Sequence, residues 1–225
     1  MDRLRPADPG GGLTSTPDVV LLPSAAAEAE LTERGSRFLA VVRPSTSLDA
    51  AADSRDAERR RYHDATHHVF AARLAGGEFR YDDDGEPSGT GGRPVLDAII
   101  ARDFVDTVVI VTRYYGGTKL GTGGLARAYG GAGALALDAC TARRVRRGEI
   151  HHVRYDYADT GAVARLLDAP EVQRGPDEFG ADVRTEIRLP TGAEAAFARL
   201  LRDATSGRAT LESDASPERC WIPVT

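Results

Sequence analysis

Cysteine is scarce in this chain of 225 residues, and its scarcity excludes two classes of site. The two cysteines, Cys140 and Cys220, lie far apart without a C-x-x-C spacing, which argues against a cysteine-based zinc site and against a disulfide framework. We therefore expect a reducing, cytoplasmic setting. No run approaches the roughly 18 consecutive apolar residues of a membrane span, and the N-terminus lacks a basic segment followed by an apolar one. We therefore expect neither export nor a membrane partner.

Positive charge is also in short supply. The chain carries 29 lysines and arginines against 34 acidic residues, a net charge of −5. This balance excludes a general polyanion-binding surface, so any contact with nucleic acid must be local. The only lysine, Lys119, lies in the most glycine-rich part of the chain, which makes its position more informative than its number.

Several catalytic patterns are absent. The motifs G-x-x-x-x-G-K-[ST] and G-x-S-x-G do not occur, no intact dinucleotide fingerprint is evident, and neither Ser88 nor Cys140 has a local activating pattern. His63 and His67 form H-D-x-x-H, but the residues around His67 look extended and no third ligand follows at a suitable distance, which argues against zinc hydrolysis. We therefore predict no catalytic residue, no metal site and no cofactor.

The N-terminal half shows alternating strand and helix patterns after a polar start. Residues 1–16 are rich in Pro, Gly, Ser and Thr, so we expect a disordered tail without a catalytic role. Arg34-Gly35-Ser36 predicts the turn of an opening hairpin, and Ser47 is a plausible N-cap for an exposed helix over residues 47–62. The other elements expected here are strands at 67–73, 78–82 and 107–111 and helices at 95–102 and 125–139.

The strand predicted at 107–111 is followed by five glycines and then by a helix of small residues. Backbone N–H groups in such a turn, together with a helix start and nearby cations, predict a phosphate cradle. The same glycines would also serve simply for tight turns and close packing of a helix on a sheet. Tyr114, Tyr115 and Tyr129 flank the turn and are candidates either for stacking on bases or for the core. The predicted anion-binding or RNA-binding set is Arg113, Gly116, Gly117, Lys119, Gly121, Thr122, Gly123, Gly124 and Arg127.

An acidic loop precedes the helix predicted at 95–102. Its carboxylates could ligate a divalent cation, and a magnesium ion bridging to phosphate is compatible with them. An EF-hand started at Asp82, however, would place an arginine where the bidentate glutamate belongs. Carboxylates in a Gly-Pro turn more often face solvent or cap the next helix. The residues predicted to form a cleft rim are His67, Asp83, Asp84, Glu86 and Arg93.

A domain boundary is expected at the arginine cluster of residues 143–147. This cluster is interpreted as a short basic linker, although four arginines are also able to contact a phosphate backbone. Residues 1–148 carry 20 acidic and 20 basic side chains, whereas residues 149–225 carry 14 and 9. The second half has strand and helix patterns in the order of a ferredoxin-like βαββαβ unit. We predict an α+β protein with an N-terminal domain over residues 17–142 and a C-terminal domain over residues 149–225.

Several short motifs lie between residues 36 and 129. They are SRF (36–38), DATH (64–67), DDGEPSGT (83–90), GRP (92–94), VTRYYGG (111–117), KLGTGGL (119–125) and RAY (127–129). Together these stretches resemble the IMPACT family, and within it the bacterial YigZ-like branch. Recognisable similarity extends from about residue 30 to 140, while the C-terminal part fits by topology. The motifs depart little from the family pattern, with Gly91, Tyr115 and Thr118 in place of alanine, phenylalanine and an aliphatic residue.

This resemblance implies both a fold and a function. It implies an N-terminal ribosomal-protein-like α/β sandwich, as in the fourth domain of elongation factor G, and a C-terminal domain similar to that factor's fifth. Both are ribosome-contacting modules. Eukaryotic relatives regulate translation through an additional N-terminal partner-binding domain, which this chain is too short to contain.

We therefore expect a non-enzymatic, translation-associated protein that binds RNA or the ribosome through the glycine-rich turn. The competing hypothesis is an enzyme that acts on a small phosphorylated ligand bound at the same turn, with His67 or the acidic loop doing the chemistry. A third is a protein-interaction adaptor, for which the partner would be another protein.

Overall fold

The chain folds as two compact units, Met1–Arg144 and Val145–Thr225. The computed structural model describes residues 18–213 and 218–224, so the tail predicted at residues 1–16 lies outside the described residues. Both cysteines are free. Among the described helices, none is both long and apolar enough to span a membrane.

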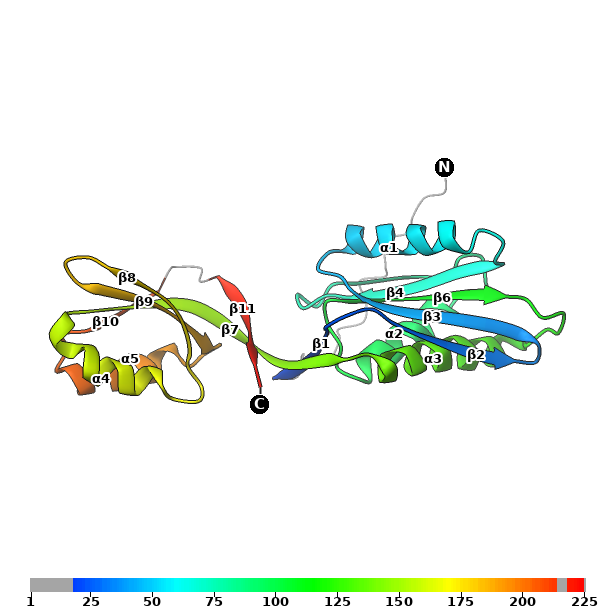
Figure 1. Ribbon diagram of the computed structural model, residues 1–225. Coiled ribbons are helices and arrows are strands. Elements are labelled where there is room, and N and C mark those ends of the chain that lie inside the picture. The colour runs from blue at the N-terminus through cyan, green and yellow to red at the C-terminus, as the bar shows by residue number, and fades with distance from the viewer. Residues whose placement is uncertain (1–17, 214–217, 225) are drawn as a thin grey trace. The chain divides into compact units, whose positions relative to one another are not determined.

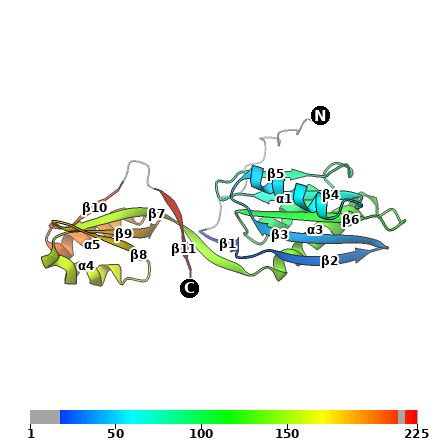
Figure 2. The same ribbon diagram turned by 45° about the horizontal axis from the view of Figure 1, so that its top comes forward.

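The first unit is built on a five-stranded antiparallel sheet with the strand order β2-β3-β6-β4-β5 (Figure 2). The hairpin predicted around Arg34-Gly35 is confirmed as β2 and β3. A short strand, β1 (Val19–Pro23), precedes the sheet. The sheet strands are β2 (Ala27–Glu33), β3 (Ser36–Pro44), β4 (His67–Arg73), β5 (Phe79–Asp82) and β6 (Thr107–Tyr114).

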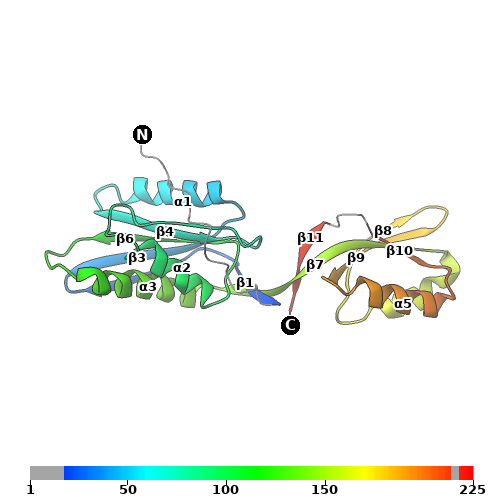
Figure 3. The same cartoon turned by 180° about the vertical axis from the view of Figure 1, so that it is seen from behind.

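Helices cover both faces of this sheet and give the unit three layers (Figures 1 and 3). On one face, α1 (Leu48–Arg61) packs over Phe70 and Ile110. On the other, α2 (Gly92–Ile100) and α3 (Gly121–Ala139) enclose the larger core. The central strand β6 is therefore buried from both sides, as its β-branched run predicts.

Helix α1 shows how local sequence sets its own boundaries. The Ser47 hydroxyl accepts a hydrogen bond from the Ala50 amide at 3.1 Å, which satisfies one of the free donors at the helix start. Asp49 lies in the first turn and arginines fill the last turn, so both ends complement the helix dipole. The helix predicted over residues 47–62 is thus confirmed.

The second unit is a ferredoxin-like βαββαβ domain, as predicted. Its antiparallel strands follow the order β10-β7-β9-β8, in which the first and last strands of the motif are neighbours. Both helices pack against one buried cluster that includes Val153, Ile187 and Leu201. The elements are β7 (Ala142–Tyr155), a single 3-10 turn η1 (Tyr157–Asp159), α4 (Thr160–Leu167), β8 (Gln173–Phe179), β9 (Val183–Pro190), α5 (Glu194–Thr205) and β10 (Thr210–Glu212).

The structure corrects two sequence-based assignments. The arginine cluster at residues 143–147 contains the boundary between the two units, as expected, but it is not an irregular linker: it lies inside β7, and part of it pairs with β11 (Arg219–Pro223), a strand that the pattern did not predict. The helix expected to begin at Leu125 begins at Gly121 instead. Three of the predicted loop glycines therefore belong to the first turn of α3.

Candidate functional site

The glycine-rich loop joins β6 to α3 and rests against the β2–β3 turn. Gly116 and Gly35 lie backbone to backbone, since a Cβ placed on Gly116 would lie 1.9 Å from the carbonyl carbon of Gly35. Ser36 secures this contact because its hydroxyl accepts a hydrogen bond from the Gly116 amide at 3.1 Å. The turn and the loop therefore form one continuous surface of the first unit.

The backbone amides of this loop fall into two groups. The amides of Tyr115 and Gly116 are used internally, the first donating to the Thr66 hydroxyl at 3.1 Å. In the part of the chain that the structure describes, the amides of residues 117–120 have no hydrogen-bond acceptor. The amides of the first turn of α3 have no intrahelical partner, and no described side chain caps them from the N-cap position. The loop therefore carries a row of backbone donors without an acceptor among the described residues.

Two cations predicted for this site accompany the free amides. Lys119 and Arg127 are both exposed, and neither has a carboxylate within ion-pair distance among the described residues. Arg127 reaches back toward the loop, with its Nη1 3.5 Å from where a Cβ on Gly123 would lie. A third cation, Arg34, lies in the adjoining turn and is paired only loosely with Glu33 at 3.8 Å. Sequence reasoning missed Arg34 because only the fold brings the two segments together.

Arg113 does not belong to this exposed set. Its guanidinium donates to the Glu86 carboxylate at 2.5 Å, and the two side chains are 6% and 4% exposed. A second bond runs from Arg113 to the Ser36 hydroxyl at 3.3 Å. The prediction that Arg113 faces an incoming anion is therefore corrected, because its charge is already neutralised inside the protein.

Glu86 is the centre of a buried polar cluster beneath the loop. Besides pairing with Arg113, its carboxylate accepts a hydrogen bond from the Tyr129 hydroxyl at 2.7 Å and lies 3.8 Å from Nε2 of His67. The Tyr129 ring packs edge-on against Phe38 at 5.0 Å between centroids. Burial, together with the bond to Glu86, raises the pKa of Tyr129, so its hydroxyl stays protonated and donates. The cluster thus ties α3 and the acidic loop to the sheet.

The other carboxylates of the acidic loop hold the loop itself. Asp84 pairs with Arg59 and accepts a hydrogen bond from the His68 amide at 2.6 Å. Asp83 faces the start of α2, where a negative charge complements the helix dipole. Its carboxylate accepts bonds, each of 2.8 Å, from the amides of Gly89, Gly91 and Gly92.

These contacts bear on the predicted cleft rim and on the magnesium ion considered for it. In the described ranges, no three His, Cys, Asp or Glu side chains are arranged to hold a metal ion. His67 is also engaged, with Nδ1 2.7 Å from the Asp84 carbonyl oxygen. Arg93 pairs with Asp97 on the surface of α2 at 2.8 Å. The rim residues therefore stabilise the local structure, and we assign them no ligand.

His68 makes the stability of this region depend on pH. Burial lowers the pKa of its ring, and the nearby Asp84 carboxylate offsets this only in part. Because folding favours the neutral ring, His68 contributes its full stability above the unfolded pKa of about 6.5 and progressively less below it. We expect the free energy of unfolding to fall as the pH drops from 7 toward about 5.5.

An NMR titration of the His68 ring should show an apparent pKa below the ordinary histidine value of about 6.5. His68→Gln should flatten the pH dependence of unfolding in the first unit. An unchanged pH dependence in the variant, or a His68 ring that titrates at the ordinary value, would contradict this prediction.

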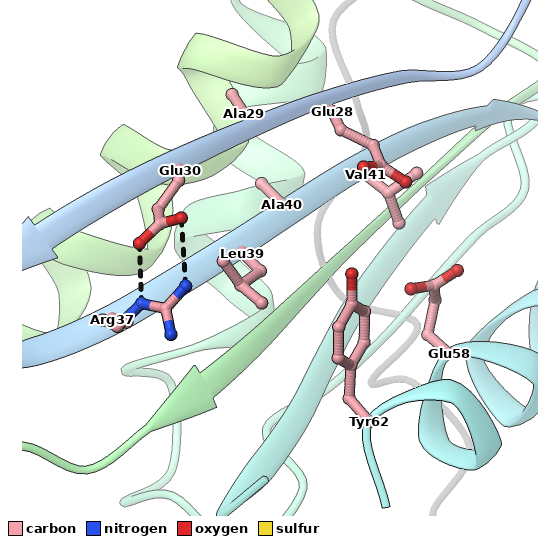
Figure 4. Close-up of a pocket in the computed structure, with 9 residues that line it drawn as sticks. All are labelled: Glu28, Ala29, Glu30, Arg37, Leu39, Ala40, Val41, Glu58 and Tyr62. Carbon is pink, nitrogen blue, oxygen red and sulfur yellow. Dashed lines mark hydrogen bonds and ion pairs between the residues drawn. The ribbon is translucent and has the colours of Figure 1, made fainter.

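A groove on the other face of the sheet was not foreseen from the sequence (Figure 4). It lies between the end of α1 and strands β2 and β3, with a volume of about 400 Å³. Its carboxylates are already neutralised, since Glu30 pairs with Arg37 at 2.7 Å and Glu58 with Arg43 at 2.5 Å. The lining residues are Glu28, Ala29, Glu30, Arg37, Leu39, Ala40, Val41, Glu58 and Tyr62. The exposed loop remains the better candidate site.

Comparisons with known proteins match both units. The Impact N-terminal domain family matches residues 34–137, and a domain of unknown function (DUF1949) matches residues 153–208. An IMPACT family member encoded in the pol 5′ region of Thermus thermophilus is 39% identical over 79% of this chain and 97% of its own length. The IMPACT family member YigZ of Escherichia coli (strain K12) is 30% identical over 83% of this chain and 94% of its own.

A solved structure also resembles this chain in fold. The crystal structure of a hypothetical protein matches with a TM-score of 0.58 and 29% identity, over 88% of this chain and 98% of that one. The matched Impact N-terminal segment, residues 34–137, contains the whole glycine-rich loop and the buried cluster beneath it.

Proposed function

This chain belongs to the IMPACT family, and from that premise we propose that it is a non-enzymatic, translation-associated protein of the cytoplasm that binds RNA or the ribosome. The family resemblance supports the link with translation, because both domains resemble ribosome-contacting modules. The surface we assign to this contact consists of the glycine-rich loop (residues 115–120), the first turn of α3 (residues 121–124) and the adjoining β2–β3 turn.

The proposal rests on the backbone N–H groups of this loop that have no hydrogen-bond acceptor in the part of the chain that the structure describes. The amides of residues 117–120 have no acceptor among the described residues, and Lys119 and Arg127 flank them without a carboxylate partner there. Convergent backbone donors at a helix start, supported by cations, favour phosphate oxygens. Contacts to phosphates supply affinity that does not depend on base sequence.

The net negative charge of the whole chain does not prevent the loop from binding phosphate. Two carboxylates of the acidic loop are engaged internally, because Glu86 is 4% exposed and paired with Arg113, and Asp83 is held by three backbone amides. Glu33, beside the β2–β3 turn, is 49% exposed and lies 3.8 Å from Arg34. The loop therefore presents positive groups while the negative groups beneath it are neutralised. A net charge of −5 then limits the binding surface to this region instead of preventing binding.

Lys119→Ala is expected to weaken binding of a short single-stranded RNA and to reduce its salt dependence. Loss of one phosphate contact should lower the slope of log affinity against log salt by about 0.7, with an equal loss for RNAs of different sequence. A fluorescence-anisotropy titration at several salt concentrations measures both quantities.

Arg60→Ala is the matched control, since Arg60 is equally exposed but lies on α1, on the other face of the sheet, without an ion pair to a described residue. It removes one positive charge from the chain and should leave the salt slope unchanged. Equal slopes for Lys119→Ala and the unaltered protein would remove the loop from the proposal.

The competing enzyme hypothesis predicts a different response at the same loop. Inorganic phosphate or a sugar phosphate present at 100 times its dissociation constant would add about 2.7 kcal/mol to the free energy of unfolding. We expect instead that RNA, and not the small phosphates, raises the unfolding temperature. The two groups named for that chemistry, His67 and the acidic loop, are held in internal hydrogen bonds.

Co-sedimentation of the native protein with ribosomal particles at moderate salt tests the ribosomal part of the proposal. We expect the protein to pellet with the particles and Lys119→Ala to shift toward the supernatant. Retention of other proteins in a pull-down, with no response to RNA or ribosomes, would favour an interaction adaptor.

A further inference from the structure

Of the three tyrosines near the loop, Tyr115 is the most exposed, and Tyr114 is half-buried. Tyr129 is fully buried, with its hydroxyl bonded to Glu86. Tyr114 is held from both ends, because its hydroxyl donates to Asp64 at 2.8 Å and a guanidinium lies over its ring. Tyr115 is 47% exposed.

The Tyr115 ring is also fixed in place. Its backbone amide donates to the Thr66 hydroxyl at 3.1 Å, and the guanidinium of Arg113 lies over the ring, 5.5 Å from its centroid. Arg113 is itself immobilised by its ion pair with Glu86 and lies 5.4 Å from the Phe38 centroid. The buried cluster therefore supports one side of an aromatic ring whose remaining surface is open.

From this arrangement we propose that Tyr115 is a stacking platform for an unpaired nucleobase, so that the loop takes single-stranded RNA in preference to duplex. This inference rests on the proposed RNA-binding function and names the class of RNA. Aromatic side chains stack on bases that are free of the double helix, whereas paired bases already stack on one another. A ring fixed before binding loses little conformational freedom when a base covers it.

The neighbours of Tyr115 favour a nucleic acid over an apolar protein surface. The next residues are Gly116, Gly117, Thr118 and Lys119, all exposed and none of them apolar in side chain. An extended chain advances at most about 3.6 Å per residue, so the Cα atoms of Tyr115 and Lys119 lie within roughly 15 Å of each other. A base on Tyr115 and phosphates on the free amides can therefore belong to neighbouring nucleotides of one strand.

The experiment compares two probes, a short single-stranded RNA and an RNA duplex of equal length, on the full chain and three variants. Tyr115→Ala should lower affinity for the single strand by about 5-fold to 150-fold, the usual range for one lost stacking contact. Its salt slope should stay unchanged, because no charge is lost. Tyr115→Phe keeps the ring and should bind as the unaltered protein does. Duplex binding should be equal for the unaltered protein, Tyr115→Ala and Tyr115→Phe; the third variant, Lys119→Ala, tests the phosphate contact.

A 2-aminopurine base in the single-stranded probe reports stacking directly, since its fluorescence falls on stacking. We expect quenching with the unaltered protein and with Tyr115→Phe, and none with Tyr115→Ala. If Lys119→Ala weakens binding but Tyr115→Ala does not, the stacking inference is overturned and the phosphate contact stands. If the unaltered protein binds neither probe, the proposed function fails along with it.

Discussion

Glu86→Ala is expected to destabilise the first unit by about 3–5 kcal/mol, the usual cost of removing one partner from a buried ion pair. The side chain of Arg113, which is 6% exposed with its partner present, would lose its counter-charge. The Tyr129 hydroxyl, in a fully buried residue, would also lose its acceptor. Because a domain is stable by only about 5–15 kcal/mol, such a loss approaches the whole stability of this unit.

Hydrogen exchange of the β3 and β6 amides is the appropriate measurement for this change. The single tryptophan, Trp221, lies on β11 in the second unit and does not report on the first. Asp97→Ala is the matched control, because it breaks an exposed ion pair with Arg93, and such pairs contribute about 0–1 kcal/mol.

A double variant separates the buried charge from the lost packing. Glu86→Leu combined with Arg113→Met removes both charges and should be more stable than Glu86→Ala, since no unpaired charge stays buried. Protection of β6 that is equal in Glu86→Ala and in the unaltered protein would show that the ion pair contributes nothing measurable.

The sequence predicted best what local pattern determines. Strand β4 was expected at residues 67–73 and is observed at His67–Arg73, and the helix begun by Ser47 ends within a residue of its predicted limit. Both follow from periodicity and from capping residues that act over a few positions. The α+β class and the order of strands and helices in the second unit follow from the same signals.

Long-range pairing explains what the sequence did not predict. Arg113 looked like an anion ligand because it stands next to the glycines, yet its partner Glu86 lies 27 residues earlier in the chain. The local sequence of residues 143–147 resembles a solvated linker. The strand that pairs with it, β11, lies more than 70 residues later, so the local pattern does not reveal the pairing. Neither partner leaves a signal in the local pattern.

Gly-rich helix α3 shows tertiary packing overriding local propensity. Glycine is about 1 kcal/mol less favourable than alanine inside a helix, so the sequence placed the first glycines in a turn. In the structure, Gly130 and Gly133 lie close against Pro94 and Val95 of α2, where a Cβ on Gly130 would be 3.3 Å from Pro94. The glycines at these two positions allow the two helices to approach closely.

Gly116→Ala is expected to cost the first unit about 1–3 kcal/mol or more and to weaken RNA binding as well. The added Cβ would lie 1.9 Å from the carbonyl carbon and 2.0 Å from the carbonyl oxygen of Gly35, and both are backbone atoms. No side-chain rotation relieves such a contact, so the β2–β3 turn and the loop must separate. Separation would break the bond from the Gly116 amide to Ser36 and move the free amides that we assign to phosphate.

Gly123→Ala distinguishes this effect from the general loss of a glycine. Its Cβ would meet only the Arg127 Nη1 at 3.5 Å, an ordinary contact with the end of a flexible side chain. Since Gly123 lies in the first turn of α3, alanine there should leave stability unchanged or raise it slightly. Chemical unfolding and RNA titration of both variants give the comparison. If Gly116→Ala retained the stability and the RNA affinity of Gly123→Ala, the contact between turn and loop would not be what shapes this surface.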